Sequence, residues 1–290
     1  TPAPTARRAR ALASPKARLL AQQRQIDLTP ITGSGVGGMI IVRDLEQQPM
    51  IRPLVPDDAV PAAGLAAPSR TRQVIAQRMT ASKQQGPHFY LMAEVDMTQV
   101  QALRRHCTDA LGWHKAPTYT DILVRACALA LRALPQVNRS FHEQGILTHE
   151  AINIGIAVST DEGLVVPTLV NADRASLREV SASVRELATR AREMRLRPAD
   201  LSSKSLSISN LGMHRVEAFI AIIDMPDPMI LAVGRVAERA VVVEKQVVIR
   251  PMCTLTLSVD HRVLDGAVAA RYLEAVVTTL ESPFAILGEV

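Results

Sequence analysis

Apolar residues recur at helical spacing in two long segments of the chain. In residues 176–195 they stand three or four positions apart, with arginine and glutamate between them: Leu177, Val180, Val184, Leu187, Ala191 and Met194. This spacing predicts an amphipathic helix with one buried face. Residues 121–134 are more uniformly apolar, and they predict a second helix that is buried on most sides.

Other apolar runs predict strands. The clearest covers residues 254–259, where leucine and valine alternate with threonine and serine. Five further segments have a similar character: residues 152–159, 163–170, 205–209, 229–233 and 241–249. After residue 259 the chain turns through DHRVLDG into a helix whose apolar face holds Ala269, Leu273, Val276 and Leu280. Strands mixed with helices of this kind predict an α/β fold.

The first 68 residues have a different pattern, with short helical runs between segments rich in proline and alanine. A helix should begin after Ser14, because Ser14 suits the N-cap and Pro15 the first helical position. A glycine-rich loop and a second helical run at residues 41–47 follow. The expected divisions are a linker (1–13), a two-helix module (14–47), a Pro/Ala-rich linker (48–68) and one α/β domain (69–290).

The composition indicates an aliphatic core, since 48% of the residues are apolar but only 3% are aromatic. A membrane-spanning helix needs roughly 18 uninterrupted apolar residues. The longest run without Asp, Glu, Lys or Arg, residues 28–42, contains four glycines and a proline. The N-terminal residues lack the apolar middle of a signal peptide. We therefore expect a soluble protein that stays inside the cell and has no membrane partner.

The basic charge is concentrated at one end of the chain. Residues 1–24 hold six basic residues and no acidic one, against a net charge of +5 for all 290 residues. Such an arm can bind phosphates or an acidic protein surface. Because the chain shows no nucleic-acid-binding motif, we expect no nucleic-acid partner. The three cysteines lie far apart without CxxC spacing, so we expect neither a metal site nor disulfides.

Residues 260–266 place four charged or titratable side chains between a buried strand and a buried helix. Buried groups of this kind need partners, and such local departures often mark a functional site. His261 is the candidate for acid–base chemistry, because histidine titrates near neutral pH. The structural alternative is that the charges only cap the helix, with Asp265 as its N-cap. The pattern alone leaves both interpretations open.

Residues 261–266 (HRVLDG) resemble the HRxxDG signature of the dihydrolipoamide acyltransferases, the E2 components of 2-oxo acid dehydrogenase complexes. Other segments resemble that family in the family's order: RQVIAQRMTASK from Arg72, PHFY from Pro87, GLVVPTLVNAD from Gly163, ISNLGM from Ile208 and LAVG from Leu231. Through ASPKARLLA and GSGVGG, residues 14–47 resemble the family's peripheral subunit-binding domain. The resemblance implies a chloramphenicol acetyltransferase-like two-layer α/β sandwich, with a mixed sheet and helices, preceded by a small helical subunit-binding module.

Acyl transfer between two thiols needs a base, because a free thiol with a pKa of about 8.5 is mostly protonated at neutral pH. The resemblance implies that His261 is this base, and that the Ser209 hydroxyl donates a hydrogen bond to the tetrahedral oxyanion. It also implies that Asp265 holds the active-site loop through an ion pair and does not relay a proton. We expect structural or surface roles for the other six histidines, although His88 lies in the PHFY segment near the family's substrate channel.

The resemblance further implies a homotrimer that assembles into a larger core, with His261 from one chain facing Ser209 of its neighbour. Coenzyme A would enter from one side and dihydrolipoamide from the other. We expect the lipoate on a lipoyl domain that is not present in this chain and that preceded residues 1–13. The ISNLGM and LAVG segments look most like the pyruvate dehydrogenase branch, so acetyl is the favoured acyl group, in the cytoplasm or a mitochondrial matrix. The choice between a 24-mer and a 60-mer core stays open.

By the same resemblance, E1 and/or E3 subunits would bind residues 14–47, with Arg18, Arg24 and Arg43 as contacts. Relatives usually carry basic residues where this chain has Met39 and Val42, which leaves the choice of partner open. The DMPDP segment from Asp224 likewise replaces a more usual Asn-Pro-Pro stretch. Two alternative functions stand beside the main one: a non-catalytic scaffold or E3-binding core protein, and an acetoin or branched-chain 2-oxo acid acyltransferase. Retention of His261, Asp265 and Ser209 favours an enzyme.

Overall fold

The structure is a computed structural model that describes residues 12–24, 28, 31–46 and 66–288. The chain divides into two compact units, residues 1–67 and 68–290, and each is described by itself. The predicted linkers at 1–13 and 48–68 fall almost entirely outside the described residues.

The small unit contains two short α-helices, as predicted: α1 (Pro15–Arg24) and α2 (Val42–Glu46), with a 3-10 turn η1 (Val36–Gly38) between them. The Ser14 hydroxyl accepts a hydrogen bond from the Ala17 amide at 3.2 Å, as expected of an N-cap. The Asp44 carboxylate accepts bonds from the backbone amides of Ser34 (3.0 Å) and Ile41 (2.9 Å), which ties the glycine-rich loop to α2. The core of the unit is made of Ala13, Ala17, Ala21, Ile40 and Leu45.

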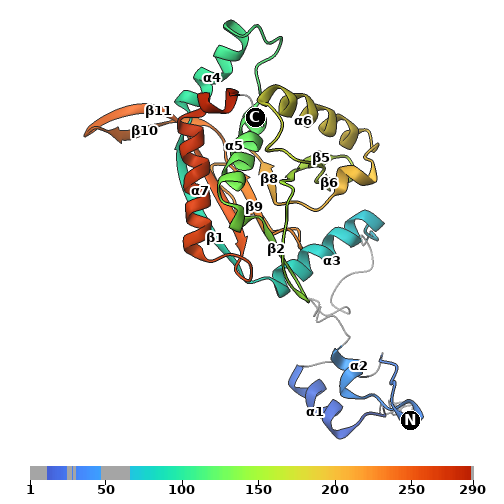
Figure 1. Cartoon of the computed structure of the whole chain (residues 1–290). Coiled ribbons are helices and arrows are strands. Elements are labelled where there is room, and N and C mark those ends of the chain that lie inside the picture. The colour runs from blue at the N-terminus through green and yellow to red at the C-terminus, as the bar shows by residue number, and fades with distance from the viewer. Residues whose placement is uncertain (1–11, 25–27, 29–30, 47–65, 289–290) are drawn as a thin grey trace, which may run out of the picture. The chain divides into compact units, whose positions relative to one another are not determined.

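The large unit is built on a seven-stranded mixed sheet (Figure 1). Its strands run in the order β1 (His88–Asp96), β11 (Gln246–Asp260), β9 (Met229–Val233), β8 (Leu206–Asn210), β4 (Ile154–Ile156) and β7 (Thr168–Leu169), with β10 (Ala237–Val243) paired to β11. β4, β8 and β9 are parallel to one another, and the other pairings are antiparallel. Two small hairpins stand beside the sheet: β2 (Arg139–His142) with β3 (Gly145–Thr148), and β5 (Val158–Thr160) with β6 (Gly163–Val165).

Helices cover one face of this sheet. In Figure 1, α5 (Tyr119–Ala133) and α7 (Gly266–Glu281) lie side by side across the strands, and α6 (Leu177–Arg192) packs next to α5. Two further helices, α3 (Arg70–Gln85) and α4 (Thr98–Asp109), precede and follow β1, and short turns η3 (Pro135–Val137), η4 (Pro198–Leu201) and η5 (Pro283–Leu287) complete the unit. Capping boxes start α5 at Thr118 and α6 at Ser176. The predicted α/β architecture is confirmed: in chain order, a small helical module is followed by a mixed sheet with helices.

The other face of the sheet is more polar and is covered by the segment between β8 and β9. Ser207, Thr256 and Ser258 are all buried there. The Ser258 hydroxyl donates to the Ala221 carbonyl at 2.8 Å, and Ala221 packs with Ile223 in a small apolar cluster. The segment between β8 and β9 therefore contacts β11 near the C-terminal end of that strand.

Several predicted strands differ from the observed ones. The strand predicted at residues 241–249 is wrong: β10 ends at Val243 and β11 begins at Gln246, with Glu244 and Lys245 at φ 49° and 66° between them. A turn with two such residues favours glycine or asparagine, so this sequence carries no turn signal. The predicted strands 152–159 and 163–170 each divide in two, because their first and second halves pair in different sheets.

No helix among the described residues is both long and apolar enough to cross a membrane. Within the same residues, no three or more His, Cys, Asp and Glu side chains form a group suited to a metal ion.

Candidate active site

His261 is the first residue after β11 and is exposed to solvent. Its backbone amide donates to the Pro87 carbonyl at 3.0 Å, so the start of β1 holds the turn in place. The imidazole packs against the Phe89 ring, with 4.5 Å between ring centroids and a tilt of 50°. The side chain is thus supported on one side and open to a reactant on the other.

The charged residues around His261 bind one another. Asp260 is buried, and its carboxylate accepts from Arg262 Nε at 3.0 Å and from the terminal guanidinium nitrogen at 2.7 Å. The Arg262 guanidinium also lies 4.2 Å from the centre of the Phe141 ring. This pairing satisfies the buried charge and gives the turn a defined shape.

Asp265 occupies the N-cap position of α7, but its carboxylate forms no capping hydrogen bond. Its backbone carbonyl accepts the bonds from Val268 and Ala269 instead, at 3.1 and 3.0 Å. The side chain is exposed and is in no ion pair with the described residues of its own chain. The structural alternative, in which the carboxylate caps the helix, is therefore not supported, and the carboxylate is available for another contact.

Ser209 lies near the end of β8, directly opposite Ala232 of β9, and is half-buried. It lines a cavity of about 700 Å³ together with residues of α6, of α5 and of the turn after β8. The next residue fixes that turn, because Asn210 donates to Thr120 Oγ1 at 3.0 Å and accepts from the Gly212 amide at 2.8 Å. Ser209 therefore stands at the wall of a cavity on a rigid strand.

One chain does not bring Ser209 and His261 together. Across the sheet, Ser209 is level with Ala232, which is level with Thr256 of β11. His261 lies five residues beyond Thr256. At about 3.3 Å per residue, the two side chains are separated by about 16 Å along the strands alone. They can act on the same reacting group only if they come from different chains.

A buried ion pair near β8, between Lys204 and Asp227, was not predicted from the sequence. Lys204 Nζ lies 3.3 Å from Asp227 Oδ2, and the same oxygen accepts from the Ser207 hydroxyl at 3.1 Å. The next carbonyl, that of Pro228, accepts from the Asp260 amide at 3.0 Å. The pair thus anchors the segment that supports the residue before His261. The DMPDP segment, which differs from the family pattern, contains Asp227. No sequence pattern indicated a role for Lys204.

The pKa of Asp227 gives a testable pH dependence. Burial raises it from 3.8 to about 6, against the opposing charge of Lys204. Because the folded-state pKa lies above the unfolded one, Asp227 favours folding below pH 3.8, and this contribution is lost as the pH rises through 6. The shift corresponds to about 3 kcal/mol.

We expect the free energy of unfolding of the wild type, minus that of an Asp227→Asn variant, to fall by about this amount between pH 3.5 and 7. Denaturant titrations at several pH values measure it. Taking this difference cancels the contribution of the other carboxylates to the free energy of unfolding, because they titrate in both proteins. A difference that stays constant over this range would show that Asp227 has an ordinary pKa.

Three of the remaining histidines and all three cysteines have structural surroundings, whereas His114 and His214 are exposed. His142 and His149 both contact the Ser140 hydroxyl, at 2.9 and 2.8 Å. His88 contacts the Gly86 carbonyl at 2.8 Å and lies beside the end of α3. All three cysteines are buried, and burial raises the pKa of Cys127 to about 12 and of Cys253 to about 11. Because a thiol must lose its proton to act as a nucleophile, these buried thiols are poor nucleophiles.

Comparison with known families matches both units. Residues 66–288 match the catalytic domain of the 2-oxoacid dehydrogenase acyltransferases, and residues 11–46 match the E3 binding domain. The chain is similar to the acetyltransferase component of the mitochondrial pyruvate dehydrogenase complex of Schizosaccharomyces pombe, at 35% identity over 96% of this chain and 62% of that protein. The Zymomonas mobilis component is 37% identical over 96% of this chain and 66% of its own length. The chain thus spans less than two thirds of these two relatives.

Solved structures are similar as well. The cubic core of a pyruvate dehydrogenase multienzyme complex matches 83% of this chain and all of its own, with a TM-score of 0.75 and 32% identity. Azotobacter vinelandii dihydrolipoamide acetyltransferase matches over the same shares, with a TM-score of 0.74 and 31% identity. Its catalytic mechanism has been investigated at a serine, a histidine 52 residues later and an asparagine four residues after that. Ser209, His261 and Asp265 have the same separations.

Proposed function

Because the chain belongs to the family of 2-oxoacid dehydrogenase acyltransferases, we propose that it transfers an acyl group between dihydrolipoamide and coenzyme A. Acetyl is the favoured acyl group, since the relatives reported above are acetyltransferase components of pyruvate dehydrogenase complexes. The observation that carries the proposal is the family match over residues 66–288, which includes the whole candidate site.

His261 is the general base of the proposed reaction. It takes the proton of the attacking thiol, which becomes a thiolate nucleophile, and returns a proton to the departing thiol. The exposed imidazole is suited to this, because the Pro87 carbonyl and the Phe89 ring hold its turn while its outer side stays open. The matching separations in the Azotobacter vinelandii enzyme support the assignment.

Ser209 is the proposed oxyanion donor, supplied by a neighbouring chain. Attack on the thioester carbonyl makes a tetrahedral oxyanion, and a hydroxyl on a rigid strand can donate to it without reorganising. Asp265 is assigned a positioning role. The asparagine at the matching separation in the Azotobacter vinelandii enzyme cannot relay a proton, and the Asp265 carboxylate is free to pair outside its own chain.

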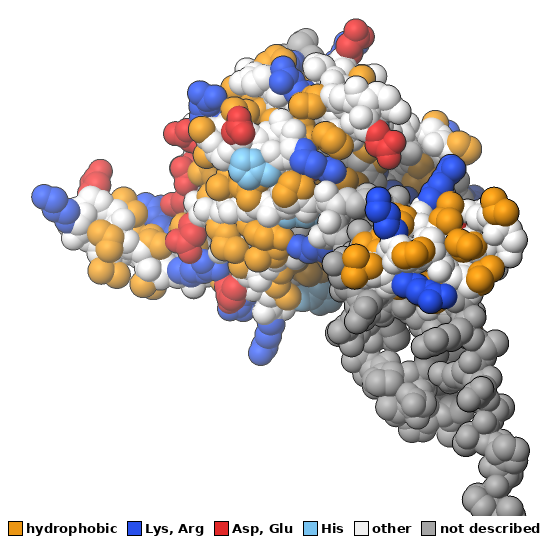
Figure 2. All heavy atoms as spheres, turned by 90° about the horizontal axis from the view of Figure 1, so that it is seen from below, with side chains coloured by type: hydrophobic (Ala, Val, Ile, Leu, Met, Phe, Trp, Pro, Cys, Tyr) orange, Lys and Arg blue, Asp and Glu red, His pale blue; other side chains and the backbone are white. Residues whose placement is uncertain are grey.

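The separation of Ser209 and His261 within one chain supports assembly into an oligomer, and we propose a homotrimer that builds a larger core, as the family resemblance implies. Exposed apolar side chains support association between chains. The hairpin of β10 and β11, which projects at the left of Figures 1 and 2, exposes Val242, Val247 and Ile249 by 73%, 74% and 71%. Apolar surface of this kind on a projecting element marks an interaction site.

The small unit is the proposed docking module for E3, and also for E1. Arg18 of α1 and Arg43 of α2 are exposed on its surface, where they can pair with acidic residues of a partner. The side chain of Arg24 lies outside the described residues. The lipoate is proposed to arrive on a lipoyl domain, and the site of action to be the cytoplasm or a mitochondrial matrix.

A thiol-transfer assay tests the function. The intact oligomer is mixed with coenzyme A and a series of acyl-dihydrolipoamides, and formation of acyl-coenzyme A is followed. We expect turnover with the acetyl compound to be fastest. Faster turnover with a branched-chain compound would show that acetyl is not the preferred acyl group. No turnover with any compound would contradict the enzyme function and favour the non-catalytic scaffold.

A further inference from the structure

The DMPDP segment lies beside the turn that carries His261. The Pro228 carbonyl accepts from the Asp260 amide at 3.0 Å, on the N-terminal side of the histidine. The Met225 sulfur lies 3.7 Å from a terminal guanidinium nitrogen of Arg262, on the C-terminal side. The segment therefore contacts the neighbours of His261 in both directions along the chain.

This segment is itself held by the buried ion pair. The Asp227 side chain is 4% exposed and the Lys204 side chain 11%. The Asp227 carboxylate pairs with Lys204 at 3.3 Å and accepts from the Ser207 hydroxyl of β8 at 3.1 Å. A buried ion pair commonly adds no net stability over well-packed apolar residues of similar size. Stability alone therefore does not explain the charges at these two positions.

Ser209 is held by other contacts. It lies opposite Ala232 in the sheet, and the next residue, Asn210, bonds with its side chain to α5 and to the turn after β8. A change at Asp227 should therefore act on the turn that carries His261 and leave Ser209 in place.

We infer that Asp227, held by Lys204, is a positioning residue for His261. It fixes the DMPDP segment, and that segment fixes the backbone on both sides of the imidazole. The inference rests on the proposed function and adds a residue that acts on the base through the backbone. A base must lie within hydrogen-bond reach of the proton that it takes, and a misplacement of about 1 Å can cost about a hundredfold in rate.

The test measures kcat and KM of the intact oligomer in the thiol-transfer assay. In an Asp227→Asn variant, kcat is expected to fall about tenfold with the KM for coenzyme A nearly unchanged, because the base is displaced and the substrate contacts are not. This variant leaves Lys204 buried without its charge partner, which is strongly destabilising. A double variant, Lys204→Met with Asp227→Leu, removes both charges. It should assemble and show the same loss of kcat, and a wild-type kcat in it would overturn the inference.

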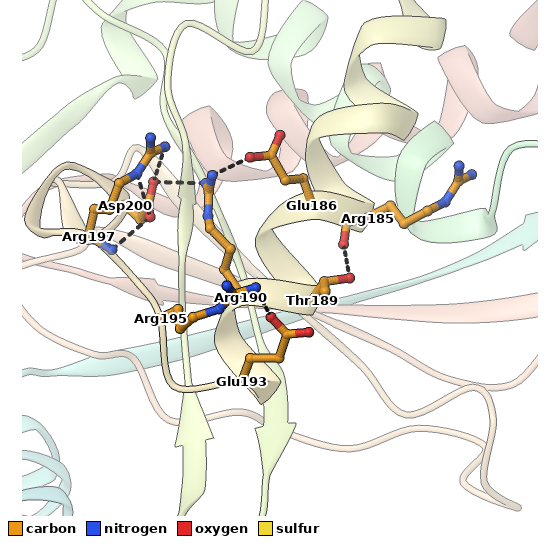
Figure 3. Close-up of polar contacts among 8 residues, drawn as sticks. All are labelled: Arg185, Glu186, Thr189, Arg190, Glu193, Arg195, Arg197 and Asp200. Carbon is orange, nitrogen blue, oxygen red and sulfur yellow. Dashed lines mark hydrogen bonds and ion pairs between the residues drawn. The ribbon is translucent and has the colours of Figure 1, made fainter.

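Asp200→Asn is the matched control. The Asp200 side chain is buried to a similar degree, with 6% exposed, and Figure 3 shows it between Arg190 and Arg197. These partners belong to α6 and to the segment that follows it. Asp200→Asn should lower stability in denaturant titrations, as Asp227→Asn does, but keep the wild-type kcat. An equal loss of kcat in both variants would reduce the role of Asp227 to general stability.

Hybrid oligomers show which catalytic group is affected. In oligomers of His261→Ala and Ser209→Ala chains, a working site takes its histidine from the Ser209→Ala chain and its serine from the other. The Lys204→Met, Asp227→Leu pair of substitutions, placed in the Ser209→Ala chain, should lower the rate about tenfold below that of the unmodified hybrid. Placed in the His261→Ala chain, it should leave the rate unchanged. Equal losses in the two placements would contradict a role specific to His261.

Failure of the inference and failure of the function have different signatures. If the wild type transfers acyl groups and the double variant keeps the wild-type kcat, the positioning role is wrong and the function stands. If the wild type transfers no acyl group to coenzyme A, the function is wrong and the positioning role fails with it.

Discussion

Replacing His261 with alanine is expected to lower the rate of acyl transfer by about a thousandfold while the oligomer stays assembled. General acid–base catalysis contributes on the order of 10²–10⁴ in rate, and without a base the attacking thiol remains protonated at neutral pH. The fold should tolerate the change, because the side chain is exposed and its turn is held by the backbone bond to Pro87 and by the Asp260–Arg262 pair.

Initial rates of acyl-coenzyme A formation measure this effect, and size-exclusion chromatography reports assembly. His114→Ala is a suitable control, because His114 is also exposed but lies in the loop before α5. It should retain the wild-type rate. A loss of less than tenfold in His261→Ala would remove this residue from the role of base.

Replacing Ser209 with alanine is expected to reduce kcat on the order of a hundredfold with little change in KM. Removal of one oxyanion donor usually costs about 10²–10³ in kcat, because the interaction forms only in the transition state. Ser209→Thr keeps a hydroxyl at the same position on β8 and should retain most of the rate. If Ser209→Ala kept the full rate, the oxyanion donor would have to be another group of the cavity.

Mixing the two inactive chains tests whether the site lies between subunits. In a cyclic trimer assembled at random from His261→Ala and Ser209→Ala chains, about a quarter of the interfaces would join an intact histidine to an intact serine. Co-expression should therefore restore about a quarter of the wild-type rate by this count. If the hybrid oligomers stayed inactive, both groups would have to act within one chain, against the separation seen along the sheet.

Elements with strong periodicity could be predicted from the sequence. The helices α5, α6 and α7 and the strands β8 and β9 appear where the apolar pattern placed them, because the apolar residues of each are buried in the core. α3 was missed as an element, since its only buried residue is Ser82 and it therefore has no apolar face to detect. The turn between β10 and β11 was missed because Glu244 and Lys245 hold positive φ angles against their own preference.

The sequence by itself predicted the α/β class and a small module before a large domain from local periodicity, and its short family motifs nominated His261, Ser209 and Asp265. The tertiary structure decided which of these groups can meet. Strand order and register place Ser209 and His261 far apart in one chain. The fold also brings Lys204, which precedes β8, to Asp227 in the segment between β8 and β9. Pairing of charges and distance between sites depend on contacts between residues far apart in the chain, and a linear pattern does not contain them.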